Sequence, residues 1–261
     1  MKNIFVTNIK IENVRHLKNI EITMPKDEMR HLILTGKNGS GKTSVLDAIS
    51  RYLNVAASDR MTRVQYLLQY MHLLGKFQQQ KVEDGEVIKD EEAVSKYTNE
   101  LNQIRSGITI EFNEPADALQ YYFEKGQFVL AYYKAERIFK ADIPKHVEKV
   151  ELKEKYSIEE EPRQIFIKYL LDLKVTEALA RSNGNTSKSE SIKKWFMKFE
   201  DLLRKIFDDG SLELVFEEET FKFFIKVKNR ELFDFNTLSS GFAAVLDIVL
   251  DIIVRMEKAT N

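Results

Sequence analysis

The chain of 261 residues contains no cysteine, which excludes disulfide bonds, thiolate catalysis and cysteine-based zinc sites. Its four histidines, His16, His31, His72 and His146, are too scattered to suggest a metal cluster. The sequence has no apolar run of about 18 residues, and its first residues lack the basic and apolar segments of a signal peptide. These absences predict a cytoplasmic protein that does not associate with a membrane.

Charge of one sign is also missing, because 40 basic residues face 41 acidic ones. This balance provides no overall field to recruit nucleic acid or an anionic membrane, although a local basic face stays possible. Net charge therefore leaves DNA binding undetermined. The 43% of hydrophobic residues is ample for a buried interior, so we expect one large globular domain or a core with a satellite.

A complete phosphate-loop motif, G-x-x-x-x-G-K-[ST], lies near the amino end. Its residues are Gly36, Lys37, Asn38, Gly39, Ser40, Gly41, Lys42 and Thr43. An apolar strand is expected before it at His31 to Thr35, and the following helix should begin near Thr43. That helix should carry one apolar stripe, formed by Val45, Leu46, Ile49 and Leu53. The alternative is a chance match in a glycine-rich turn, which the flanking strand and helix argue against.

The residue types fit the chemistry of a triphosphate. Glycines at 36, 39 and 41 let the backbone turn its N–H groups toward phosphate oxygens, and the helix N-terminus adds partial positive charge. We expect Lys42 to reach the β- and γ-phosphates and the Thr43 hydroxyl to coordinate Mg²⁺. Ser44 completes the predicted binding residues for ATP and Mg²⁺.

Composition and periodicity divide the chain into five segments. Residues 1–57 are the first part of the nucleotide-binding core, 58–106 a helical insertion, 107–139 core strands, 140–207 a helical lobe, and 208–261 a core hairpin with a last helix. Alternating apolar residues predict two strands around a turn at Asn13 to Lys18. The same pattern predicts strands at 108–112 and 128–133 and a β-hairpin at 212–227.

Helical spacing fills the remaining segments. Two helices are expected in 58–106 with a break near Gly85, and a helix through 165–173 should end at a loop from Ser182 to Ser189. The next helix carries a long apolar stripe that favours the core over a partner-binding surface: Ile192, Trp195, Phe196, Phe199, Leu202, Leu203, Ile206 and Phe207. The last helix, 240–257, is nearly all apolar, and its one polar line is Asp247, Asp251 and Arg255.

A second motif, Leu238-Ser239-Ser240-Gly241, directly precedes that last helix. Alone it also fits an ordinary helix N-cap, since serine and glycine are common there. Following a phosphate loop, it resembles the L-S-G-G-Q signature of ABC-type ATPases. In those proteins the serine, the glycine amides and the helix N-terminus contact the γ-phosphate bound to the opposite subunit.

Three segments together resemble one family. These are I-K-I-E-N-V-R-H-L-K-N-I-E-I, G-K-N-G-S-G-K-T-S-V-L-D-A-I and F-D-F-N-T-L-S-S-G-F-A-A-V-L-D-I-V. They look like the head of AAA-family ATPases related to the SMC, Rad50 and RecF group, and most like bacterial ATPases of the overcoming-lysogeny defence type. The resemblance implies an α/β P-loop NTPase with an ABC-type head, in which a mixed sheet surrounds the phosphate-loop helix and a helical lobe is inserted.

The resemblance also implies roles for single residues. Gly36 to Thr43 would hold the triphosphate and Mg²⁺, and Ser239, Ser240 and Gly241 would contact the nucleotide of a partner subunit. Asn13 and Arg15 match a segment near the nucleotide in the family, with a solvated turn as the alternative. Arg137 resembles a basic residue after a core strand, with a structural ion pair as the alternative.

The sequence departs from the family in two respects. An apolar strand ending in Asp-Glu and a later histidine that senses the γ-phosphate are both missing, and Asp247 and Asp251 belong to the signature helix instead. The expectation is an N-terminal fragment of a longer ATPase that binds ATP with little turnover. Sustained heptads are also missing, so helices of about 18 residues, each under ~30 Å, should form a compact lobe without a long arm.

These features predict an ATP-driven switch. Two heads would form a nucleotide-dependent homodimer and transmit closure to a nuclease or another effector partner. The alternative is a P-loop kinase with residues 58–106 as its lid, although that segment offers only Arg60, Arg63 and Arg105 to line it. A GTPase lacks support because no N-K-x-D motif is present, and an interaction module with a structural nucleotide stays open.

Overall fold

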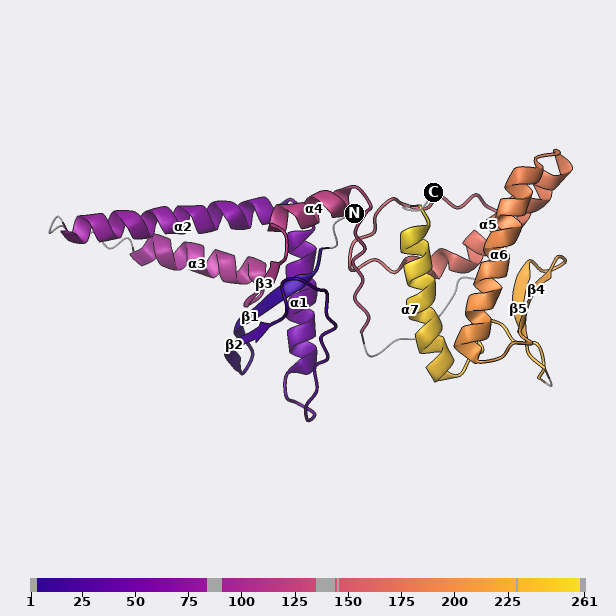
Figure 1. Ribbon diagram of the computed structural model, residues 1–261, viewed down its shortest axis with the longest axis horizontal. Coiled ribbons are helices and arrows are strands. Elements are labelled where there is room, and N and C mark those ends of the chain that lie inside the picture. The colour runs from indigo at the N-terminus through magenta and orange to yellow at the C-terminus, as the bar shows by residue number, and fades with distance from the viewer. Residues whose placement is uncertain (1–3, 84–90, 135–143, 145, 229, 259–261) are drawn as a thin grey trace. The chain divides into compact units, whose positions relative to one another are not determined.

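The computed structural model describes residues 4–83, 91–134, 144, 146–228 and 230–258 (Figure 1). The chain forms two compact units, residues 1–130 and 131–261, and each is described by itself. Within the described residues, no helix combines the length and the apolar character needed to cross a membrane.

The first unit contains a three-stranded sheet with the order β2-β1-β3. Strand β1 (Val6–Val14) pairs with β2 (Leu17–Thr23) on one side and with β3 (Ile108–Phe112) on the other. The predicted strands around the turn at 13–18 and at 108–112 are thereby confirmed. Every pairing between described strands is antiparallel, so the expected mixed sheet is not seen in this part of the chain.

Helix α1 (Lys42–Ala56) packs against this sheet and shares its core. The helix begins where the motif predicts, and most of the predicted stripe faces the core, since Val45 is buried and Ile49 and Leu53 are partly buried against it. Leu46 is 44% exposed, whereas the buried positions are Val45, Ala48, Tyr52, Val55 and Ala56. The Tyr52 hydroxyl donates to the Ile110 carbonyl 3.2 Å away, so a residue outside the predicted stripe ties the helix to β3.

Helices α2 (Arg60–Glu83) and α3 (Glu91–Arg105) lie side by side as a helical hairpin, and α4 (Ala116–Glu124) packs on α1 (Figure 1). Two helices are thus confirmed in the segment 58–106, while the predicted break near Gly85 lies outside the described residues. Helix α2 has 24 residues and spans about 36 Å, which is longer than expected from the sequence.

Two predicted strands are wrong. Residues 31–35 and 128–133 pair with none of the described strands. A strand needs a neighbour for its backbone hydrogen bonds, and neither segment pairs with the free edge of β2 or β3. In the first of these segments Leu32 and Ile33 are exposed, Ile33 to 80%, whereas Leu34 is partly buried against the core.

The second unit packs three long helices with a hairpin. A 3-10 turn (Pro162–Ile165) leads into α5 (Phe166–Ser182), which is followed by α6 (Thr186–Phe207). Strands β4 (Glu213–Glu217) and β5 (Lys222–Lys226) form the predicted hairpin, and α7 (Ser240–Glu257) has the predicted bounds. The predicted loop at 182–189 is too long, because Asn185 caps α6 by accepting from the Lys188 N–H at 3.1 Å.

The apolar stripe of α6 faces the core of this unit, as predicted. Ile192, Phe196, Phe199 and Leu203 are buried, and they pack with residues of α5, β5 and α7. Phe199 lies 5.2 Å from Phe166 between ring centroids, and Phe196 lies 6.4 Å from Phe223. This core holds α7 and the small residues that precede it in a fixed position within the unit.

Candidate functional site

The phosphate loop closes on the ammonium group of its own lysine. The Nζ atom of Lys42 donates to the carbonyl oxygens of Gly36 at 2.7 Å and Lys37 at 2.8 Å, and it lies 3.4 Å from the Ser40 hydroxyl. Gly39 and Gly41 have φ values of 79° and 92°, in the left-handed region that favours glycine. The loop therefore curls around a cation, with its glycines where side chains would be strained.

The loop leads directly into the N-terminus of α1. Gly41 is the N-cap and has no side chain that could cap the helix, and the first turn holds no acidic residue. Thr43 is exposed and Ser44 is half-buried. The first N–H groups of a helix lack intrahelical acceptors and carry partial positive charge, so this end offers an anion amide donors, an ammonium group and hydroxyl groups.

The tip of the β1–β2 hairpin lies against this loop. A side chain on Gly41 would begin 2.9 Å from Leu17 Cδ1 and 3.3 Å from His16 Cε1. Arg15 sits on the tip with a φ of 54° and is exposed. The sequence predicts a turn here but does not single out His16. In the structure, the pairing of Val14 with Leu17 makes Arg15 and His16 the two turn residues.

The other side of the hairpin is fixed by Gly107. Its carbonyl accepts from the N–H groups of Glu12 at 3.0 Å and Asn13 at 3.1 Å, and a Cβ there would lie 2.1 Å from the Asn13 carbonyl oxygen. The Arg105 guanidinium adds an ion pair with Glu12 at 3.2 Å. Asn13 thus serves the contact with Gly107 through its backbone, and the tip beyond it is held beside the phosphate loop.

The second motif forms the N-terminus of α7. Ser239 is the N-cap with extended backbone (φ −61°, ψ 151°), yet its side chain makes no capping hydrogen bond. Ser240 and Gly241 are exposed, and a Cβ on Gly241 would meet no atom within 4 Å. Asn185 in the same unit does cap its helix. The hydroxyl of Ser239 is therefore not used as an ordinary N-cap would use it.

Buried charges hold α7 in place further along the helix. The predicted polar line Asp247, Asp251 and Arg255 is almost fully buried. Arg255 Nε donates to Asp251 Oδ2 at 2.6 Å, the Tyr133 hydroxyl donates to the same oxygen at 2.8 Å, and Arg163 forms an ion pair with Asp247. Burial and the nearby carboxylate raise the pKa of the Tyr133 hydroxyl well above its usual value. These two aspartates are structural ion-pair partners on a helix.

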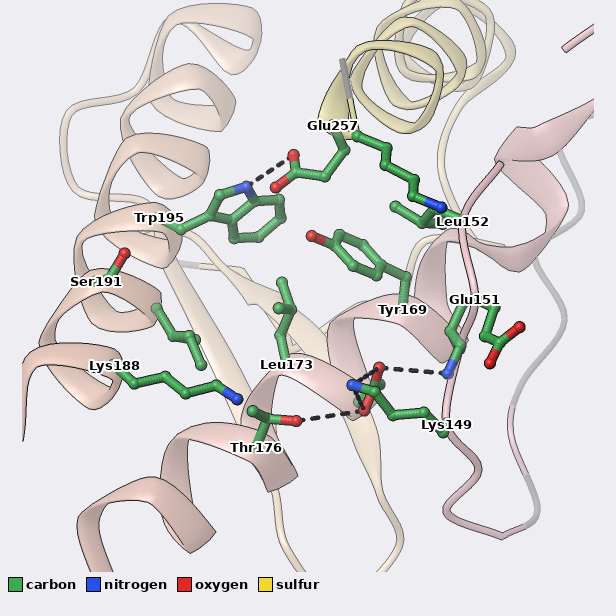
Figure 2. Close-up of a pocket in the computed structure, with 14 residues that line it drawn as sticks. Lys149, Glu151, Leu152, Tyr169, Leu173, Thr176, Lys188, Ser191, Trp195 and Glu257 are labelled. Carbon is green, nitrogen blue, oxygen red and sulfur yellow. Dashed lines mark hydrogen bonds and ion pairs between the residues drawn. The ribbon is translucent and has the colours of Figure 1, made fainter. Parts of the chain in front are cut away.

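A cavity of about 710 Å³ lies between α5, α6 and the end of α7 (Figure 2). Glu257 accepts from the Trp195 ring N–H at 3.1 Å, and burial together with Glu257 raises the pKa of the Tyr169 hydroxyl well above its usual value. At the other end, the buried Asp172 carboxylate accepts from Lys149 Nζ at 2.8 Å. The carboxylates of Glu257 and Asp172 are thus engaged by the protein itself, and they connect the walls of the cavity.

Three arginines considered in the sequence have no demonstrated place at this site. Arg137 lies outside the described residues. Arg63 makes two hydrogen bonds with Glu100, at 2.9 and 3.1 Å, and Arg105 pairs with Glu12, so both serve contacts within the chain. Over the part of the chain that the structure describes, no group of three or more histidine, aspartate and glutamate side chains could hold a metal ion.

Relatives share a short stretch with this chain. The DNA replication and repair proteins RecF of Rickettsia prowazekii (strain Madrid E) and Rickettsia typhi are 50% identical over 52 residues, and that of Rickettsia massiliae is 48% identical over the same length. The match covers 20% of this chain and only 14% of each relative. No solved structure gave a significant match.

The family comparison covers far more of the chain. The model of the AAA ATPase domain matches residues 5–247, which include the phosphate loop, both small sheets and the start of α7. The expected kinship with RecF-like ATPases agrees with the shorter matches. The chain belongs to the AAA ATPase domain family.

Proposed function

We propose that this chain is the ATP-binding head of an ABC- or SMC-like ATPase that acts as a nucleotide-dependent switch. The observation that carries the proposal is the loop that curls around Lys42 Nζ and runs into the uncapped N-terminus of α1. This arrangement collects positive potential at one exposed point, which suits a triphosphate. Membership of the AAA ATPase family supports nucleotide binding by the chain.

The residues of the loop fit Mg²⁺ and ATP in chemical type. Backbone N–H groups from Gly39 onward would bind the phosphates, and Lys42 would exchange its loop carbonyls for phosphate oxygens. The exposed Thr43 hydroxyl is an oxygen ligand of the kind that Mg²⁺ prefers, and Ser44 follows it in the same turn. Bound Mg²⁺ would neutralise charge on the phosphates. Arg15 on the hairpin tip would add a further cation near this end of α1.

The signature residues would act on the nucleotide of a second copy. Ser239 presents a hydroxyl that makes no capping bond, and Ser240 and Gly241 are exposed beside it at a helix N-terminus. This supports a ligand role over the alternative of a plain N-cap. ATP would then join two heads, with each phosphate loop facing the signature of the other, and closure would be passed to an effector partner.

Turnover is expected to be slow in this chain. Phosphoryl transfer to water needs a residue that orients the attacking water, in addition to charge neutralisation. Asp247 and Asp251 are buried on α7 in pairs with Arg163 and Arg255, so we assign them no part in hydrolysis. A kinase lid also loses support, because Arg63 and Arg105 are engaged by glutamates of the chain.

Sedimentation velocity with a non-hydrolysable ATP analogue and Mg²⁺ tests the switch. We expect the chain to shift from monomer to dimer with the analogue, and Ser240→Ala to weaken the dimer while leaving nucleotide binding intact. Ser211→Ala, in a loop of the same unit, is the matched control and should dimerise normally. A monomer that persists at high protein and saturating nucleotide concentrations would contradict the dimer.

A further inference from the structure

His16 is placed at the phosphate loop by contacts on both sides of its hairpin. On one side, the Gly107 carbonyl holds the backbone of Glu12 and Asn13. On the other, Gly41 leaves room for the side chains of His16 and Leu17, which a Cβ at that position would contact at 3.3 and 2.9 Å. These observations place the hairpin tip beside the phosphate loop.

The edge of the imidazole that faces Gly41 is its polar edge. The nearest ring atom is Cε1, which is bonded to both ring nitrogens. A neutral imidazole carries one N–H donor and a protonated one carries two, so this edge offers a donor in either state. His16 is also exposed, which leaves its ring open to a ligand that occupies the loop.

Gly41 is the residue from which the chain enters α1, so the ring lies near the N-terminus of that helix. Leu17 fills the space on the hydrophobic side of the tip and packs on the core of the first unit. His16 is exposed at the tip, so of these two side chains the imidazole is the one accessible to an anion bound at the α1 N-terminus.

We propose that His16 is a phosphate-contacting residue of this site and donates a ring N–H to an oxygen of the bound triphosphate. The proposal rests on the proposed function of the phosphate loop. It adds a donor from the β1–β2 hairpin to the donors of the loop itself, and it makes the hairpin tip part of the anion site. The loop motif alone gives no sign of this donor.

Calorimetric titration of the full chain with two ligands, Mg·ATP and inorganic triphosphate, tests the contact. Because a hydrogen bond to a charged group contributes substantially to binding, His16→Ala should lower the affinity for both ligands about tenfold. His16→Gln keeps a side-chain N–H donor and should recover most of the affinity. His72→Ala, at an exposed position of α2, is the matched control and should bind both ligands like the unchanged chain.

Five outcomes separate the possibilities. Equal losses for both ligands in His16→Ala support the contact, and a ligand-induced shift of the His16 Cε1 proton resonance with none at His72 supports it further. Unchanged affinity overturns it, and so does a loss confined to Mg·ATP, which would place the ring at the ribose or base. Failure of the unchanged chain to bind either ligand would instead remove the proposed function. Circular dichroism of each variant checks that the fold is kept.

Discussion

Helices α1 and α7 both begin after a run of small residues, but their N-termini are built differently. The chain enters α1 through Gly41 in the left-handed region, with a loop wrapped around Lys42 Nζ. It enters α7 through Ser239 with ordinary extended backbone, and buried ion pairs fix that helix further along. The unusual backbone geometry of α1 is concentrated at its N-terminus. Helix α7 has ordinary backbone geometry at its N-terminus and is held by buried ion pairs.

This difference suggests a division of labour between the two units. A glycine-lined loop suits a site that encloses a ligand, because the backbone itself supplies the hydrogen-bond donors. An exposed serine on an anchored helix suits a contact that is completed by another surface. Variants that alter the support of one N-terminus should therefore leave the other unaffected.

The largest effect is expected from removing a buried charge under α7. Asp251 is fully buried and binds Arg255 and Tyr133, so Asp251→Ala leaves a buried guanidinium without its carboxylate. We expect a loss of about 3–5 kcal/mol in the free energy of unfolding, measured by denaturant titration. The control Asp201→Ala breaks the exposed pair with Arg204 and should cost under about 1 kcal/mol. Equal losses would contradict the anchoring role.

A smaller loss in the free energy of unfolding is expected when a side chain is added at Gly107, which contacts the β1–β2 hairpin. Gly107 has a φ of 71°, and a Cβ there would lie 2.1 Å from the Asn13 carbonyl oxygen. Gly107→Ala should cost about 2–3 kcal/mol and weaken nucleotide binding, because the tip must move. Gly184 in the other unit has a φ of 74° with no atom near its Cβ. Gly184→Ala should cost about 1 kcal/mol with normal binding, and similar behaviour of both variants would refute the close contact.

The N-caps of α6 and α7, Asn185 and Ser239, should respond differently to alanine. Asn185 accepts from the Lys188 N–H, so Asn185→Ala should lower the free energy of unfolding by about 1 kcal/mol. Ser239 makes no such bond, and Ser239→Ala should change stability by less than about 0.5 kcal/mol while weakening the nucleotide-dependent dimer. Thermal unfolding and sedimentation measure the two effects. If Ser239→Ala lowered stability as much as Asn185→Ala, Ser239 would be an ordinary N-cap and the ligand role would be contradicted.

The smallest effect concerns acid stability of the sheet in the first unit. The hydrogen bond from Lys10, 2.7 Å from Glu111, lowers the pKa of the Glu111 carboxyl below its usual value. The pair therefore adds stability above the pKa of the unfolded chain, and this stability disappears as the pH falls through the lower pKa of the folded state. Glu111→Gln should flatten the stability profile slightly below about pH 5, because the pair is exposed. An unchanged profile would mean that the pair contributes nothing.

Local sequence patterns predicted the elements whose hydrogen bonds form between residues close together in the chain. The glycines and Lys42 identify the loop, alternation identifies the hairpins, and helical spacing gives α6 and α7. Residues 31–35 and 128–133 were predicted as strands from local sequence, but a strand also needs a pairing partner, which local sequence does not specify.

The site was only partly predictable for the same reason. Leu46 is apolar yet faces outward. Tyr52, which carries a polar hydroxyl, is instead buried on the core side of α1 and donates to the Ile110 carbonyl. His16 gave no signal because its position depends on where the hairpin tip meets Gly41, a contact between segments about 25 residues apart. The polar line of α7 was predicted, but the sequence did not identify Arg163 as the partner of the buried Asp247.

Calorimetric titration of Mg·ATP into the full chain and into Lys42→Ala tests the central claim most directly. Lys42 Nζ lies at the centre of the loop, so we predict measurable heat with the unchanged chain and at least about a hundredfold weaker binding in the variant. Lys37→Ala, which alters an exposed side chain of the same loop, should bind far more like the unchanged chain. No heat with the unchanged chain, or equal affinity in Lys42→Ala, would contradict the account.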